Sequence, residues 1–201
     1  MKLFRTPRPS RHFAMLAAAA LLASSSGVFA QTSQKISNVY ITWYGFNDNS
    51  CEVETQYNCN TIAFPKSDGY PVKHEVATEG QGTYADPITF ATAANDYGGN
   101  AEFKPGTIIY VPMVRKYFIM EDQCFECIAD WKKKRYHVDL WMGPSFEQNA
   151  TQLYACENKL TQGSARAGTG VIIVNPAPNL PVATAPIYKD GKCTTSLYPN
   201  Q

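Results

Sequence analysis

The chain has 201 residues, with 18 Lys and Arg against 17 Asp and Glu, and 13 each of Gly and Pro. The first thirty residues contain four of the basic side chains and no acidic one, so the remainder is mildly acidic, with 14 basic and 17 acidic residues. This balance argues against nucleic acid as a partner. The remainder has the size of a single domain.

The N-terminal segment has the pattern of a secretory signal peptide. Four basic residues precede residue 12, an apolar run spans 14–23, and small residues lead to an expected cleavage site after Ala30. An uncleaved anchor is the weaker alternative, because the apolar run is shorter than the roughly 20 residues of a membrane helix. We therefore expect residues 1–30 to be removed, and a protein without a membrane span that is secreted to the periplasm or the extracellular space.

Six cysteines follow this segment, and an even number after a signal peptide indicates disulfides formed in an oxidising compartment. They are Cys51, Cys59, Cys124, Cys127, Cys156 and Cys193. Proximity along the chain suggests that they pair in this order. A zinc site is the weaker alternative, because the chain contains a single Cys-x-x-Cys motif. We expect neither a metal nor another cofactor.

Short β-branched and aromatic runs alternate with segments rich in Gly, Pro, Asn and Asp, and few stretches have helical periodicity. This pattern predicts an all-β barrel or sandwich. After a polar leader at 31–38, the expected strands are 39–44, 88–92, 107–111, 117–120 and 137–142.

The end of the chain is expected to be an extension, residues 158–201. A short helix could form within 145–155. An apolar run at 171–174 is followed by an Ala-Pro-rich segment at 175–186. Pairing of Cys193 with Cys156 would tie this extension back to the barrel.

Two aspartates lie in or beside apolar strands, where a carboxylate is costly unless it is paired, protonated or functional. Asp139 stands inside the run 137–142, and Asp122 follows the run 117–120. The apolar neighbours of Asp139 would desolvate it and raise its pKa. A carboxylic acid that stays protonated near neutral pH is what cleavage of a glycosidic bond requires.

Asp86, which precedes a proline, is a third candidate catalytic carboxylate. Trp43, Tyr44 and Trp141 are candidates for stacking on sugar rings. His137 is expected to lie on the strand face opposite Asp139 and to have a structural role.

The motif Thr42-Trp43-Tyr44-Gly45 resembles the opening of expansin-type domains, and His137-Val138-Asp139-Leu140 resembles the His-Phe-Asp element of expansins and family 45 endoglucanases. The contexts of Asp86, Asp122 and Asp139 resemble the three-aspartate domain of MltA-type lytic transglycosylases. These families, with RlpA-like proteins, share the six-stranded double-psi β-barrel. The resemblance therefore implies that fold for residues 39–157, with disulfide-stapled loops.

The resemblance also implies a protein that acts on cell-wall polysaccharide, with Asp139 as general acid and Asp122 or Asp86 as a second carboxylate. We expect the protein to be a monomer. Where the endoglucanases carry their catalytic base, this chain has Gly45 and Phe46, with Asp48 slightly beyond. That departure favours either a lytic transglycosylase or a non-catalytic, expansin-like wall-loosening protein. A secreted interaction or effector protein on the same scaffold is a third possibility, and the sequence leaves all three open.

Overall fold

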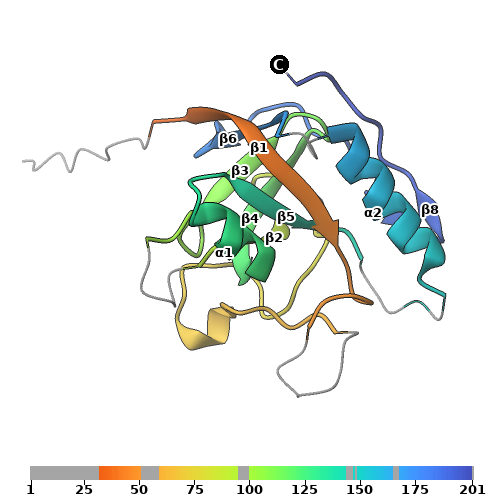
Figure 1. Cartoon of the computed structure of the whole chain (residues 1–201), viewed down its shortest axis with the longest axis horizontal. Helices are drawn as coiled ribbons and strands as arrows, with labels where there is room; N and C mark the ends of the chain where they lie inside the picture. Colours follow the sequence, from red (N-terminus) through yellow and green to blue (C-terminus); the bar gives the residue numbers. More distant parts are fainter. Residues whose placement is uncertain are drawn as a thin grey trace, which may run out of the picture. The chain divides into compact units, whose positions relative to one another are not determined.

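A computed structural model describes residues 32–50, 59–94, 100–143, 147, 149–164 and 168–200. Six strands close into a barrel in the order β1-β5-β2-β4-β3-β6 (Figure 1). Their bounds are β1 Gln34–Tyr44, β2 Ile88–Thr92, β3 Ile108–Val111, β4 Lys116–Gln123, β5 His137–Trp141 and β6 Gly170–Val174. The expectation of a mostly β protein built on a closed six-stranded barrel is confirmed.

The barrel mixes parallel and antiparallel pairs. β1 runs parallel to β5 and β2 runs parallel to β4, while the other four pairs are antiparallel. Alternate side chains fill the interior, where the rings of Trp43 and Phe118 meet edge to face at 6.5 Å. Since β1 and β4 are not neighbours in the sheet, this contact crosses the inside of the barrel. Residues adjacent to the inward-pointing ones, such as Thr42, therefore face outward.

Strand β1 begins inside the segment that we expected to be a flexible leader. Within Gln34–Ser37 only Ile36 is buried, and the segment pairs with β6. Its polar composition reflects a half-exposed strand. The register shifts between Ser37 and Val39, where Asn38 adopts a left-handed conformation with φ 61°.

The barrel also continues past the boundary expected at residue 157. Strand β6 comes from the predicted extension and lies between β3 and β1, where it closes the sheet. Helix α2 (Thr151–Ser164) separates β6 from β5 along the chain. The local pattern showed the apolar run but could not show its distant partners.

The described residues include two α-helices beside the barrel and one 3-10 turn, η1 (Lys66–Asp68). Helix α1 (Phe125–Trp131) occupies the Cys-x-x-Cys segment, and the backbone N–H of Cys127 donates to Cys124 Sγ at 3.0 Å. Helix α2 starts later than the expected helix and packs along β1 (Figure 1). Its buried side chains include Leu153, Cys156 and Leu160.

Two of the expected disulfides, Cys124–Cys127 and Cys156–Cys193, are confirmed. The second joins α2 to the small hairpin of β7 (Tyr188–Lys189) and β8 (Lys192–Cys193). The third expected pair includes Cys51, which lies outside the described residues.

The Pro-rich extension runs over strands β3 and β4. The Tyr110 hydroxyl donates to the carbonyl of Pro181 at 2.6 Å, and the Lys116 ammonium donates to the carbonyl of Ala183 at 2.9 Å. The extension is thus fastened to the barrel wall. Among the described residues, no helix is both long and apolar enough to span a bilayer.

Candidate functional site

The strand register places the two candidate aspartates in one row across the outside of the barrel. Thr42 of β1 is paired with Asp139 of β5. Asp139 is also paired with Ala91 of β2, and Ala91 with Asp122 of β4. The backbones of the two aspartates are two strand spacings apart, which is roughly 10 Å. The small side chain of Ala91 separates them.

Two adjoining cavities lie over this row. One has a volume of about 310 Å³ and contains Asp139, and the other has about 350 Å³ and contains Asp122. Asn49, Ser50, Gln123 and Phe125 line both cavities, and we call the two together the aspartate groove.

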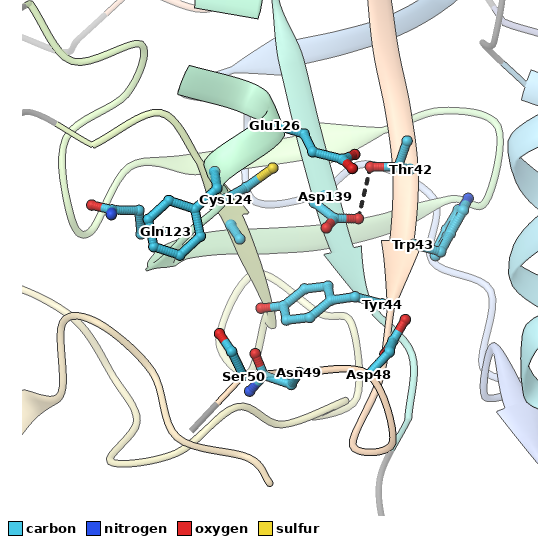
Figure 2. Close-up of a pocket in the computed structure, with 12 residues that line it drawn as sticks. Thr42, Trp43, Tyr44, Asp48, Asn49, Ser50, Gln123, Cys124, Glu126 and Asp139 are labelled. Carbon is cyan, nitrogen blue, oxygen red and sulfur yellow. Dashed lines mark hydrogen bonds between the residues drawn. The ribbon is translucent and has the colours of Figure 1, made fainter. Parts of the chain in front are cut away.

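Figure 2 shows the cavity around Asp139. Glu126 and Thr42 lie at one end and Asp48 at the other, with Asp139 and Tyr44 between them. Acidic side chains therefore face this cavity from three elements: Asp48 from the loop after β1, Glu126 from α1 and Asp139 from β5.

Asp122 is buried and strongly held. Its Oδ1 accepts hydrogen bonds from the backbone N–H groups of Ala63 (3.0 Å) and Gln123 (2.8 Å), and the Tyr44 hydroxyl donates to Oδ2 at 2.9 Å. Burial raises the pKa of Asp122 to about 6, while these three donors act in the opposite direction. At neutral pH the ionised form therefore predominates.

Asp139 is partly buried and has fewer donors. The Thr42 hydroxyl lies 2.7 Å from its Oδ1 and donates to the ionised carboxylate. Burial raises the pKa of Asp139 to about 7, and the negative charges of Asp48, Glu126 and Asp122 add to the effect. Asp139 therefore keeps its proton to a higher pH than Asp122 does.

His137 is connected to Asp139 through Thr42. Its Nε2 lies 2.9 Å from Thr42 Oγ1, and its Nδ1 lies 3.0 Å from Asp130 Oδ2. The expectation that His137 faces away from Asp139 is wrong, because residues two apart in a strand point to the same side.

Asp86 is not brought to the groove. Its carboxylate lies before β2, is 42% exposed and approaches His74 Nε2 at 3.8 Å. The buried carboxyl beyond it belongs to Glu121, which accepts hydrogen bonds from the Lys73 and His74 backbones and from the Thr89 hydroxyl. Glu121 thus orders the loop in front of β2.

The three aromatic residues expected to stack on sugars are buried instead. Trp43 is 5% exposed and Trp141 is fully buried, with its ring edge to face with Tyr44 at 5.1 Å. Tyr44 lies at the groove and serves as a donor to Asp122. The exposed ring at the groove is that of Phe125, at 65%. Its position depends on α1, so no local sequence signal indicated it.

Three further acidic residues, Asp48, Glu126 and Glu157, were not among the candidates. Asp48 lines the Asp139 cavity, and its Oδ1 accepts from the backbone N–H of Gly45 at 2.7 Å. Glu157 is 8% exposed on α2, and burial, with the charges of Asp48 and Asp139, raises its pKa to about 9. Asp48 had a weak signal, since it follows the place of the endoglucanase base, whereas Glu157 had none.

One group of potential metal ligands occurs in the described part of the chain. Donor atoms of Cys124, Cys127 and His137 lie within 4.8 Å of one another. Both sulfurs are joined in a disulfide, so neither is a thiolate ligand in this structure.

The fold and the groove define a closed six-stranded barrel protein with carboxyl groups lining an outer groove. The chain matches the model of the DDB_G0273701 N-terminal domain family over residues 36–194, and it belongs to this family. The match runs from β1 through β8 and includes the whole groove.

The chain is also similar to a protein of Dictyostelium discoideum that bears the name uncharacterized protein DDB_G0273701/DDB_G0273221. The two are 33% identical over 168 residues, which make up 83% of this chain and 63% of the relative. The chain therefore spans less than two thirds of the length of that relative. No solved structure matches the chain significantly.

Proposed function

We propose that this protein binds a polysaccharide in the aspartate groove and cleaves a glycosidic bond there, with Asp139 as the general acid. The observation that carries the proposal is a carboxyl group with a pKa of about 7 that opens onto a groove and shares a row with a second carboxyl. The mixed parallel pairing and the motif resemblance support a double-psi barrel. The signal-peptide pattern supports secretion and action on a cell wall.

The chemistry divides between the two aspartates. Protonated Asp139 gives its proton to the leaving glycosidic oxygen. Asp122, with a pKa of about 6, is the ionised partner at neutral pH and can activate water or stabilise positive charge at the sugar. Inverting glycosidases hold their carboxyl groups about 6.5–9.5 Å apart. The backbone separation of roughly 10 Å, from two strand spacings, is compatible with that range.

The groove walls suit a sugar chain. Phe125 offers an exposed ring on which a sugar can stack. Asn49, Ser50 and Gln123 supply polar atoms to both cavities, and Gln123 Oε1 is buried with no hydrogen-bond partner among the described residues. An apolar face with a few convergent polar groups is typical of ligand sites.

The test is digestion of peptidoglycan, cellulose and chitin by the wild type and by Asp139→Asn, with products identified by mass spectrometry. Asp68→Asn is the matched control, because Asp68 is an exposed residue of η1 outside the groove. We expect products from the wild type and the control, and none from Asp139→Asn. New reducing ends would identify a hydrolase, and anhydro-sugars a lytic transglycosylase. Products that persist in Asp139→Asn would refute the role of Asp139.

A non-catalytic, wall-loosening role is the second candidate. It is favoured by Gly45 and Phe46, which stand where the endoglucanases carry their base. Co-sedimentation with an insoluble glycan in the absence of any product would support it. If no glycan binds at all, a secreted interaction protein becomes the better proposal.

A further inference from the structure

Four side chains form an unbroken hydrogen-bonded chain from α1 to Asp139. Asp130 Oδ2 contacts His137 Nδ1 at 3.0 Å, and His137 Nε2 contacts Thr42 Oγ1 at 2.9 Å. Thr42 Oγ1 in turn contacts Asp139 Oδ1 at 2.7 Å. The outer end of the chain reaches solvent, because the Asp130 side chain is 18% exposed and binds the half-exposed Arg135 at 3.2 Å.

The number of hydrogens available fixes their order when Asp139 is protonated. The Asp130 carboxylate can only accept, so His137 carries its hydrogen on Nδ1. Its Nε2 is then an acceptor in the neutral ring, and the Thr42 hydroxyl donates to it. The Asp139 O–H donates to Thr42 Oγ1. Every contact in the chain then has one hydrogen, and both His137 and Asp139 are uncharged.

The same chain is also complete when one proton has moved. If His137 is an imidazolium ion, Nε2–H donates to Thr42 and the Thr42 hydroxyl donates to the Asp139 carboxylate. The two arrangements contain the same number of protons and differ by two short transfers, through Thr42. In contrast, an ionised Asp139 beside a neutral His137 leaves one contact without a hydrogen, because Thr42 has a single hydrogen for two acceptors.

We infer that Asp130, His137 and Thr42 form a proton relay that holds one shared proton on the His137–Asp139 pair and moves it between the two residues. From the imidazolium form of His137, Nε2–H passes its proton to Thr42 Oγ1 while the Thr42 hydroxyl proton passes to the Asp139 carboxylate. His137 ends neutral with its hydrogen on Nδ1, Thr42 ends as a hydroxyl, and Asp139 ends protonated. After Asp139 has given this proton away, the pair takes up a new one at Asp139 from water in the groove. These residues act through Asp139 and are positioning residues.

Other charged groups face the pair. Glu126 of α1 acts on both His137 and Asp139, Arg135 acts on His137, and Asp48 and Asp122 act on Asp139. Burial lowers the pKa of His137, which favours the neutral ring in the first arrangement. These charges couple the two titrations through space, so the test has to separate that coupling from the hydrogen-bonded one.

The use of the relay in catalysis rests on the proposed function, but the relay itself can be tested without a substrate. The experiment is an NMR titration of the mature protein that follows the His137 ring nitrogens and the Asp139 carboxyl carbon. The signals of His137 are assigned by their loss in His137→Gln. In the wild type we expect His137 to be the Nδ1–H tautomer at pH 6. We also expect the chemical shift of its Nε2 to change with the same midpoint pH as that of the Asp139 carboxyl carbon.

The matched variants are Thr42→Val, which keeps the shape but lacks the hydroxyl, and Thr42→Ser, which restores it. In Thr42→Val we expect the Nε2 chemical shift of His137 to stop responding when Asp139 titrates, and in Thr42→Ser we expect the response to return. A response that depended only on through-space coupling would be present in both variants. Asp130→Asn should give a mixture of tautomers at His137. An Nε2–H tautomer in the wild type, or an unchanged Nε2 response in Thr42→Val, would overturn the relay.

Activity gives a separate result. If a glycan substrate is found, Thr42→Val should lower kcat with little change in KM, and Thr42→Ser should recover it. If no glycan is cleaved, the proposed function fails while the NMR titration still decides the relay.

Discussion

Replacing Glu157 by Gln should make the protein more stable at neutral pH, and increasingly so as the pH rises. Glu157 lies on α2 between the buried residues Leu153 and Leu160, and its Oε1 has no hydrogen-bond partner among the described residues. Its pKa is raised from 4.5 to about 9, first by burial and then by the charges of Asp48 and Asp139. The folded protein therefore keeps a proton that the unfolded chain releases above pH 4.5.

The sign and size of the effect follow from proton linkage. Because the folded-state pKa is raised, the contribution of Glu157 to stability is intact below pH 4.5 and is lost progressively as the pH rises towards 9. The loss is about 1.4 kcal/mol per pH unit, or roughly 3 kcal/mol between pH 4.5 and pH 7. Gln has a similar shape and does not titrate, so Glu157→Gln escapes this loss.

The assay is urea unfolding of the wild type and Glu157→Gln at pH 5, 6 and 7. The difference in unfolding free energy should grow by about 1.4 kcal/mol at each step, since other titrating groups are common to both proteins and cancel. Glu75→Gln is the control for the exchange itself, because Glu75 is exposed and lies in a loop outside the groove. Parallel curves for Glu157→Gln and the wild type would refute a buried, proton-retaining Glu157.

Three further predictions concern the groove and the disulfide. Ala91→Leu should abolish glycan binding with an unchanged fold by circular dichroism, because the larger side chain would fill the space between Asp139 and Asp122; binding that survives would place the ligand elsewhere. Any glycan cleavage should have a bell-shaped pH profile, rising as Asp122 ionises near pH 6 and falling as Asp139 loses its proton near pH 7; a flat profile across pH 5–8 would exclude this pair. Replacing both Cys156 and Cys193 by Ser should lower the unfolding free energy by about 4 kcal/mol, because the disulfide closes a loop with a sequence separation of 37 and so restricts the unfolded chain. An unchanged unfolding free energy in chemical denaturation would contradict this prediction.

The strands could be predicted where the local pattern was complete. Ile88–Thr92 is β-branched and bounded by Asp86-Pro87, and it forms β2 with those bounds. Ile108–Val111 follows a Pro-Gly turn and forms β3. Strand β6 was visible as an apolar run, but its place in the barrel depends on pairing with Gln34–Val39, far away in the sequence. Local composition contains no information on such a partner.

The candidate site could be predicted where its residues stand in a clear local pattern, but not where it depends on contacts between distant segments. Asp139 and Asp122 were recognisable because each carboxylate stands within or beside an apolar strand, and the register of β2 brings them into one row. Asp86 has an equally suggestive motif, but it precedes β2 and lies by His74. Phe125 reaches the groove only because Cys124 starts a helix there.

The different roles proposed for the two aspartates follow from their hydrogen-bond donors. Burial is the main cause that raises the pKa of both Asp122 and Asp139, and nearby negative charges raise both further. Asp122 accepts two backbone N–H groups and the Tyr44 hydroxyl, whereas Asp139 has only Thr42 among the described residues. Donors that stabilise the charged form lower a pKa. The donors from Gln123 of β4, from the loop residue Ala63 and from Tyr44 of β1 therefore favour the ionised form of Asp122, while Asp139, with fewer donors, has the higher pKa.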